Sequence, residues 1–365
     1  MDCPKTEAEL ARLITDAEAP LAILGGGSQG VAVQGRPVSV REMSGVALYE
    51  PGALTLVAQA GTPVSEVQAL LAQEGQQLAF EPRDLRGLMA TEGNPTLGGA
   101  FAANQSGPRR IQGGAARDFL LGVRFVDGAG QVVKNGGRVM KNVTGYDLVK
   151  LMAGAHGTLG VLSEVSLKVL PRAAATGTIQ ISDLSVEQAI QAMARALGSP
   201  FDVTGAAHGA WGSDDAPHTW IRVEGFEESV TYRIAQLQKL LAQFGPAEVE
   251  TDPDIWQIVR DVTPFHNTTG AVWRLSVKPS DAPVVLDRLA PDQALLDWGG
   301  GLIWVLISDA CNVRAALGDI AGHATLVRGT GAPRFHPEPA PVAALSAGLR
   351  DRFDPRGILN TGLMG

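Results

Sequence analysis

Short apolar runs and longer segments with an apolar residue at every third or fourth position alternate along residues 1–172. The runs predict strands, and the spaced pattern predicts amphipathic helices. In the run 161–169, Val161 and Val165 alternate with positions such as Glu164 and Lys168, so one face of that strand should be buried and the other mostly wet. Predicted strands span residues 21–24, 54–60 and 161–169, a hairpin turns at 127–128, and predicted helices span 7–16, 62–75 and 146–152.

The composition changes at PRAAATGT, residues 171–178, and we place a domain boundary there. Strands and helices then follow in an order like β-α-β-β-α-β. This order predicts an α+β layer, in which two helices cover one face of an open antiparallel sheet. Predicted strands span residues 178–182, 219–226, 273–277 and 302–307, and predicted helices span 186–197, 230–244 and 342–353.

The stretch 91–121 is rich in glycine and holds little apolar bulk before Phe119, so it should not supply a core. Glycine lets bare backbone approach a ligand, and Pro95 and Pro108 fix the path of the chain. A wall of exposed N–H groups suits an anion such as a pyrophosphate. A passive surface loop is the alternative, but long loops without secondary structure are uncommon in compact domains.

A second glycine-rich turn, Gly25 to Gly30, satisfies the pattern G-x-G-x-x-G directly after a predicted strand. A Rossmann site also needs a helix to begin at this turn. The following VAVQGRPVSV alternates and contains Gly35 and Pro37, which disfavours a helix. We therefore expect a glycine-rich anion cradle between two short strands rather than a Rossmann site.

The composition disfavours several functional classes for this chain. The 365 residues are 45% hydrophobic and carry a net charge of −8, which disfavours nucleic-acid binding. Cys3 and Cys311 form no CxxC pair and cannot ligate an iron–sulfur cluster by themselves. No signal peptide or membrane-spanning run is visible, so we expect a cytoplasmic protein.

Several segments together resemble a known family. In order they are the early glycine-rich turn, EPGALTLVAQAGTPVSEVQALL, TLGGAFAANQSGP, RDFLLGVRFVDGAGQVV, KNVTGYDLVKLMAGAHGTLGVLSEVSLKVLP and the closing FDPRGILNTGLM. This set resembles the vanillyl-alcohol oxidase and para-cresol methylhydroxylase (PCMH-type) flavoproteins, and within them the FAD-binding subunits of glycolate oxidases. The resemblance implies a two-subdomain FAD-binding domain (1–172), an α+β cap domain (173–330) and a C-terminal segment (331–365) that packs back on the FAD domain.

The same resemblance assigns cofactor roles to particular residues. The first turn would wrap the pyrophosphate, the second glycine-rich stretch would line the flavin, and a third turn would hold the adenine and ribose. Some family members attach FAD through a histidine in the first turn, but Ser28 and Gln29 stand there, so we expect non-covalent FAD. The implied residues are Gly25, Gly26, Gly27, Ser28, Gln29, Thr96, Gly98, Gly99, Asn104, Ser106, Gly107, Gly157, Gly160 and Val161, with Pro82 and Asp118 nearby.

Oxidation of a 2-hydroxy acid needs a base for the hydroxyl proton and a cation for the carboxylate, and histidine and arginine fit these roles best. His266 with Arg274, and His323 with Arg328, are conceivable pairs. For each histidine a surface or hydrogen-bonding role is the stronger interpretation. His156 should be structural, His208 and His218 should be exposed, and no histidine spacing suggests a metal.

The leading hypothesis is an FAD-binding subunit of a complex that oxidises glycolate to glyoxylate, with electrons passing to a partner or a quinone. The expected partners are a larger flavoprotein subunit, which would hold most of the substrate site, and an iron–sulfur subunit. The complex would be cytoplasmic, with peripheral association at the inner membrane face. The alternatives are a stand-alone FAD oxidoreductase of the same superfamily acting on another hydroxylated substrate, and a non-catalytic scaffold.

Overall fold

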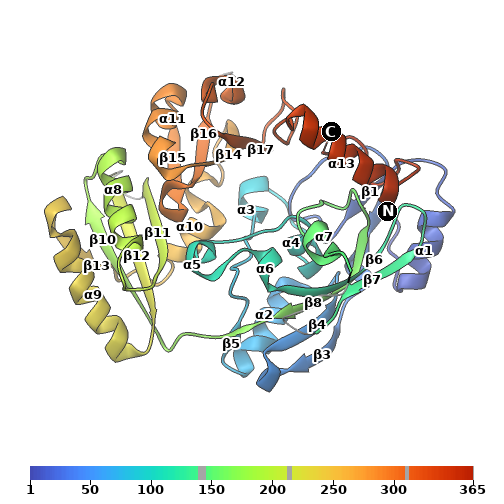
Figure 1. Cartoon of the computed structure of the whole chain (residues 1–365), viewed down its shortest axis with the longest axis horizontal. Helices are drawn as coiled ribbons and strands as arrows, with labels where there is room; N and C mark the ends of the chain where they lie inside the picture. Colours follow the sequence, from blue (N-terminus) through green and yellow to red (C-terminus); the bar gives the residue numbers. More distant parts are fainter. Residues whose placement is uncertain (139–144, 212–215, 309–311, 365) are drawn as a thin grey trace. The chain divides into compact units, whose positions relative to one another are not determined.

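The computed structural model describes residues 1–138, 145–211, 216–308 and 312–364, which form two compact units (Figure 1). The first unit comprises residues 1–106, 114–172 and 337–365, and the second comprises 107–113 and 173–336. The sequence-based division did not anticipate that 107–113 belongs with the second unit. Cys311 lies outside the described residues.

The first unit is built on a five-stranded antiparallel sheet in the order β3-β4-β8-β6-β7. Its central strand β8 is buried along almost its whole length, and only Glu164 and Lys168 are half-exposed. The expected mostly wet face is therefore wrong, because Leu162 and Ser166 on that face are also buried. The strands are β3 Val46–Glu50, β4 Thr55–Gln59, β6 Leu120–Val126, β7 Val132–Gly136 and β8 Val161–Lys168, and the short pair β5 Gln76–Gln77 and β9 Leu170–Pro171 lies apart.

A separate two-stranded parallel sheet joins β1 (Leu21–Leu24) to β2 (Arg36–Ser39) across the first glycine-rich turn. The C-terminal segment runs beside β1, since the Leu21 N–H donates to the Ile358 carbonyl at 2.7 Å and the Asn360 N–H donates to the Leu21 carbonyl at 3.0 Å. The chain that follows the second unit thus completes the first one. The helices of the first unit are α1 Glu7–Thr15, α2 Val64–Gln73, α3 Arg86–Met89, α4 Leu97–Ala102, α6 Ala116–Phe119, α7 Leu148–Met152 and α13 Ala340–Phe353.

The second glycine-rich stretch has its own secondary structure and buried residues, which corrects the expectation that it would not supply a core. Helix α4 forms inside it, and the Thr96 hydroxyl accepts from the Gly99 N–H at 3.3 Å to cap the helix. Phe101 is fully buried, and its ring centroid lies 5.2 Å from that of Phe80. A threonine cap and one aromatic anchor stabilise a helix that two glycines disfavour.

The second unit is an eight-stranded antiparallel sheet in the order β13-β10-β12-β11-β15-β16-β14-β17. Apolar side chains of α8, α9, α11 and α12 pack with one face of this sheet into a continuous core. The predicted antiparallel sheet with helices is confirmed, and it is larger than expected. The strands are β10 Ala175–Ser182, β11 Val203–Ala210, β12 Pro217–Gly225, β13 Ala247–Val249, β14 Ala271–Val277, β15 Gln293–Asp297, β16 Leu302–Ile307 and β17 Gly322–Arg328, and the helices are α5 Arg110–Gly113, α8 Val186–Leu197, α9 Glu227–Leu241, α10 Ile255–Asp261, α11 Ala282–Leu289 and α12 Val313–Leu317.

Polar contacts fix the segment 107–113 within the second unit. The guanidinium of Arg109 makes a two-point ion pair with Glu224, at 2.6 and 2.9 Å, and both side chains are mostly buried. The Trp298 indole N–H donates to the Gly107 carbonyl at 3.0 Å. Arg109 therefore stabilises the second unit.

Candidate functional site

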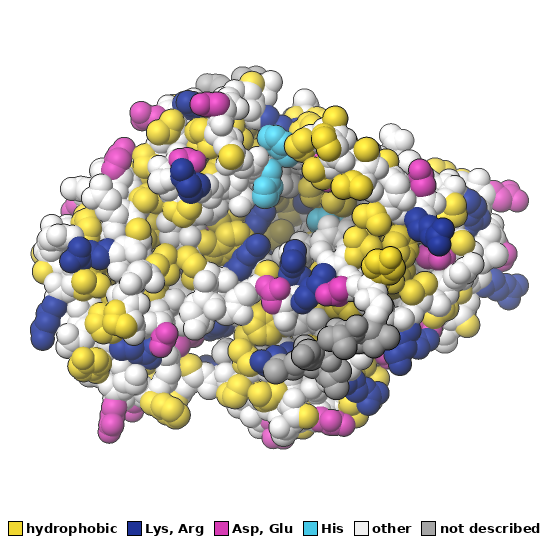
Figure 2. Space-filling model, in the orientation of Figure 1, with side chains coloured by type: hydrophobic (Ala, Val, Ile, Leu, Met, Phe, Trp, Pro, Cys, Tyr) yellow, Lys and Arg dark blue, Asp and Glu magenta, His cyan; other side chains and the backbone are white. Residues whose placement is uncertain are grey.

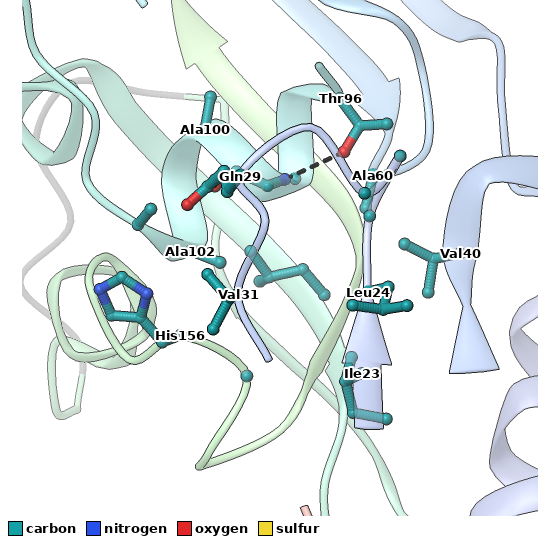
Figure 3. A pocket seen from close by; sticks show the side chains of 18 of the residues that line it. Ile23, Leu24, Gln29, Val31, Val40, Ala60, Thr96, Ala100, Ala102 and His156 are labelled. Atoms are coloured by element: carbon teal, nitrogen blue, oxygen red, sulfur yellow. Dashed lines mark hydrogen bonds between the residues drawn. The ribbon is translucent and has the colours of Figure 1, made fainter. Parts of the chain in front are cut away.

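A cavity of about 300 Å³ lies within the first unit, where three glycine-containing segments and the C-terminal segment meet. Figure 3 shows Ile23, Leu24 and Val40 on one side of it, with Val31, Ala102 and His156 on another. Small or bare residues make up much of its wall, and among the described residues no Asp, Glu, Lys or Arg side chain lines it. Of the residues expected to bind the cofactor, those that line this cavity are Gly25, Gly26, Gly27, Ser28, Gln29, Thr96, Gly98, Gly99, Gly157, Gly160 and Val161.

The two glycine-rich walls touch through their main chains. A Cβ on Gly26 would lie 1.7 Å from the Asn94 carbonyl oxygen, and a Cβ on Gly93 would lie 1.8 Å from the Gly26 oxygen. Side chains also link the walls, because the Gln29 amide donates to the Gly99 carbonyl at 3.1 Å. Only glycine permits this approach, so the sequence pattern is a requirement of the cavity itself.

In the first glycine-rich turn, Gly25 to Gly30, the backbone at Gly27 is exposed to the cavity. Gly27 has a φ of +80°, and a Cβ placed on it would meet nothing within 4 Å. Backbone N–H groups in such a turn form an anion-binding concavity without a cationic side chain. The residues present therefore fit the diphosphate of a dinucleotide, held by main-chain donors between small side chains such as Ala60 and Ala100.

Five residues of the expected set lie outside the lining of this cavity and have structural contacts instead. The Asn104 side chain accepts from the Arg117 N–H, at 3.0 Å. The side chains of Ser106 and Asp118 accept from the N–H groups of Ala116 and Ala115, both at 2.9 Å. These bonds shape the chain after α4. The five residues are Pro82, which is buried, Asn104, Ser106, Gly107, whose carbonyl binds Trp298, and Asp118.

The C-terminal segment supplies wall residues that the sequence interpretation missed. Asn360 lines the cavity, and its side chain donates to the His156 carbonyl at 2.8 Å and accepts from the Ile23 N–H at 2.7 Å. It thereby joins β1 to the third glycine turn. The closing motif ILNTG was visible in the sequence, but nothing local to it indicates a contact 337 residues away.

His208 is buried, so the expectation that it is exposed is wrong. It lies on β11, and its Nδ1 is 2.9 Å from the Thr219 hydroxyl. Burial, and then the charge of His218, lower its pKa from 6.5 to about 4 although a backbone hydrogen bond at His218 opposes this. A neutral buried imidazole stabilises the fold fully above pH 6.5, and that contribution is lost as the pH falls towards 4.

The residues of the two candidate histidine–arginine pairs make other contacts. His266 Nε2 lies 3.0 Å from the Asp261 carbonyl oxygen, whereas Arg274 packs over the Trp298 ring. Arg328 donates to the Phe265 carbonyl at 3.0 Å. No group of three or more metal-ligating side chains occurs among the described residues.

Comparison with known proteins agrees with this geometry. The sequence profile of the FAD binding domain family matches residues 1–136. The chain is 36% identical to glycolate oxidase subunit GlcE of Escherichia coli over 371 aligned residues, which cover 100% of this chain and 98% of that protein. The chain belongs to the GlcE family.

More distant relatives are similar in sequence to only part of this chain. Glycolate oxidase subunit GlcD of Bacillus subtilis is 38% identical over 77 residues, which are 21% of this chain and 16% of that protein. D-lactate dehydrogenase of Anaerostipes hadrus is 42% identical over 76 residues, again 21% and 16%. Among solved structures, alkyldihydroxyacetonephosphate synthase superposes with a TM-score of 0.74 at 17% identity, covering 98% of this chain and 75% of that one.

These likenesses confirm the predicted PCMH-type α+β fold and FAD as the cofactor of this GlcE-family chain. They also confirm an FAD-dependent oxidoreductase of the glycolate oxidase group. In the part of the chain that the structure describes, every helix is too short or too polar to cross a membrane.

Proposed function

We propose that this chain is the FAD-carrying GlcE-type subunit of an oxidase that converts glycolate to glyoxylate. The observation that carries the proposal is the full-length likeness to GlcE, together with a cavity walled by the glycine segments that such a cofactor needs. Bound FAD supplies the hydride acceptor, which is chemistry of the cofactor and not of the polypeptide.

The chain's own residues would hold the cofactor mainly by main-chain contacts. The turn Gly25 to Gln29 would bind the diphosphate through N–H groups. Thr96, Gly98 and Gly99 would lie along the flavin side, and Gly157 with Val161 along the adenosine side. The apolar wall would exclude water from the reacting end.

The cofactor should be held without a covalent bond, because the first turn carries Ser28 and Gln29 rather than histidine. Precipitation of the purified yellow protein with acid should release the flavin absorbance into the supernatant. Colour that stays in a washed pellet would contradict non-covalent binding. A colourless protein that fails to take up added FAD would favour a scaffold.

Assembly with a larger flavoprotein subunit is supported by the surface of α13. This helix has 14 residues, and none of them is buried. Val342, Leu345 and Leu349 are exposed along it, and Figure 2 shows hydrophobic side chains at the surface where Figure 1 draws α13. A helix of this length gains most of its stability from packing, so an apolar helix without buried residues indicates a docking site.

The partner we propose for α13 is the larger flavoprotein subunit of the same oxidase. GlcE and GlcD are both named as subunits of glycolate oxidase, so a chain of this family needs a surface for another subunit. The first ten residues of α13 carry no charge, which fits an apolar groove on that partner. An iron–sulfur subunit would complete the complex, and the electrons would pass to that partner or to a quinone.

Replacing Val342, Leu345 and Leu349 together by Gln should weaken binding to the larger flavoprotein subunit by roughly tenfold or more. Because all three side chains are exposed, FAD content and thermal stability should stay at the wild-type level. Co-purification of tagged subunits and their Kd by calorimetry would measure the effect. Phe226→Gln, at an exposed apolar residue of the second unit, is the matched control.

Unchanged binding by the triple variant would exclude α13 as the docking surface. If the wild-type chain bound no larger flavoprotein yet oxidised a hydroxylated substrate alone, the stand-alone alternative would hold.

A further inference from the structure

One face of the sheet in the second unit carries polar side chains near its β17 edge. In the antiparallel pairing of β14 with β17, Arg274 lies opposite Thr325 and Ser276 lies opposite His323. Residues paired directly or two positions apart share a face of a sheet. The intervening residues, including Leu275 and Ala324, belong to the apolar core under the helices. Arg274 and His323 therefore lie together on the face opposite that core.

Two guanidinium groups pack on a single indole at this face. The Cζ of Arg110 lies 4.4 Å from the centroid of the Trp298 ring, and the Cζ of Arg274 lies 5.3 Å from the same centroid. Arg110 comes from α5 and Arg274 from β14, so two distant segments bring their charges to one aromatic side chain. Stacking on an indole positions a guanidinium and leaves its edge N–H groups directed along the ring plane.

Trp298 is held in a strained conformation. Its φ is +54°, a left-handed value that is unusual and unfavourable for a bulky residue. Two hydrogen bonds maintain it, from its backbone N–H to the Asp297 carboxylate at 2.7 Å and from its indole N–H to the Gly107 carbonyl at 3.0 Å. Strain of this kind is concentrated at ligand-binding positions, where a side chain must be placed against its preference.

The positive charges of Arg274 and Arg110 act on the side chain of His323. The pKa of His323 is lowered, first because neighbouring atoms displace water from it. Nearby positive charges lower it further, in the order Arg274 on β14, His336 after β17 and Arg110 on α5. His336 is itself bound through Nδ1, which accepts from the Ala324 N–H at 3.2 Å, and burial together with Arg314 lowers its pKa. His323 is thus a neutral imidazole beside two permanent cations at neutral pH.

We propose that Arg110 and Arg274, positioned by Trp298, bind the carboxylate of a small 2-hydroxy acid, and that His323 accepts a hydrogen bond from its hydroxyl group. The choice of a 2-hydroxy acid rests on the proposed function, whereas the preference for a carboxylate rests on the two guanidinium groups. A neutral imidazole nitrogen suits a hydroxyl donor better than a second anion.

The sequence alone paired His266 with Arg274 and His323 with Arg328. The structure instead groups His323 with Arg274 and adds Arg110 and Trp298, which no sequence pattern connects.

Binding of glycolate to the FAD-loaded chain tests the proposal. The flavin is photoreduced first, so that glycolate is not oxidised during the measurement. Calorimetry should show binding of glycolate, weaker binding of acetate, and none of ethylene glycol, which lacks the carboxylate. Arg274→Gln and Arg110→Gln should each weaken glycolate binding about tenfold or more, as expected for loss of a charge-assisted hydrogen bond. Arg288→Gln, in a surface pair with Asp319 of the same unit, should leave it unchanged.

Histidine ring resonances give a readout besides affinity. In the chain labelled at histidine, the resonance that disappears in His323→Gln identifies His323, and glycolate should raise its pKa because the carboxylate offsets both arginines. The resonance of His208, whose pKa responds to burial and His218, should not move.

Failure of glycolate to bind, or an equal loss in Arg288→Gln and Arg274→Gln, would overturn the carboxylate site. Binding without any movement of the His323 resonance would overturn the assignment of His323. FAD content is measured on the same samples. A chain that contains FAD but does not bind glycolate would contradict the carboxylate site and leave the cofactor assignment intact.

Discussion

Gly26→Ala should abolish FAD binding. Its Cβ would lie 1.7 Å from the Asn94 carbonyl oxygen, a backbone atom that cannot move without separating the two glycine-rich walls. Because the open turn at Gly27 and the flavin-side residues Gly98 and Gly99 belong to those two walls, separating them would remove the proposed diphosphate cradle. The absorbance of bound flavin in the purified variant, and its Kd for added FAD, would measure the loss.

Gly52→Ala is the matched control, because a Cβ there meets nothing within 4 Å and its φ is not left-handed. It should bind FAD like the wild type. Circular dichroism and thermal melting of both variants without FAD would separate a folded chain that lost its cradle from an unfolded one. A folded Gly26→Ala chain that retains FAD would show that the contact between the walls is not required.

Glu224→Ala should reduce the free energy of unfolding by about 3–5 kcal/mol, because it leaves the buried Arg109 without its carboxylate. Arg222, whose side chain is 3% exposed, would lose its ion pair with the same group. Urea unfolding followed by tryptophan fluorescence would measure the change. Asp319→Ala, which removes a carboxylate from the surface pair with Arg288, should cost less than about 1 kcal/mol.

The pH dependence gives a second test of the Glu224 network. Burial opposes the charged form of Glu224, but the hydrogen bond from Arg109 and the charges of Arg222 and Arg109 outweigh it and lower the pKa to about 2. The stabilisation is present above the ordinary value of 4.5 and is lost as the pH falls towards 2. Glu224→Ala should lose this part of the acid sensitivity. A variant as stable as the wild type would show that the ion pair is dispensable.

Strongly periodic elements could be predicted from the sequence. The helix predicted at 186–197 and the strand predicted at 302–307 have those bounds in the structure, as α8 and β16. Each has an uninterrupted apolar pattern that local chain preference also supports. The two glycine-rich walls were likewise recognisable, because close contact between backbones demands glycine itself.

Elements without local signals were missed. Strand β11, VTGAAHGA, consists mainly of small residues and reads as a loop, yet β12 and β15 pair with it on either side and bury it. Helix α4 contains two glycines and forms only because Thr96 caps it and Phe101 is buried. Asn360 and Trp298 acquire their roles from contacts 337 and 191 residues away along the chain, which no local pattern encodes.

The first unit is assembled from three separate pieces of the chain, and Asn360 of the last piece joins β1 to the turn at His156. During translation the nascent polypeptide therefore exposes an unfinished flavin pocket until Ile358 and Asn360 have left the ribosome, whereas the second unit is complete once His336 has emerged. We therefore expect flavin to bind only after Asn360 has emerged. Release of a ribosome stalled just before Ile358 would yield a folded cap attached to an apoprotein unable to close its own cofactor pocket.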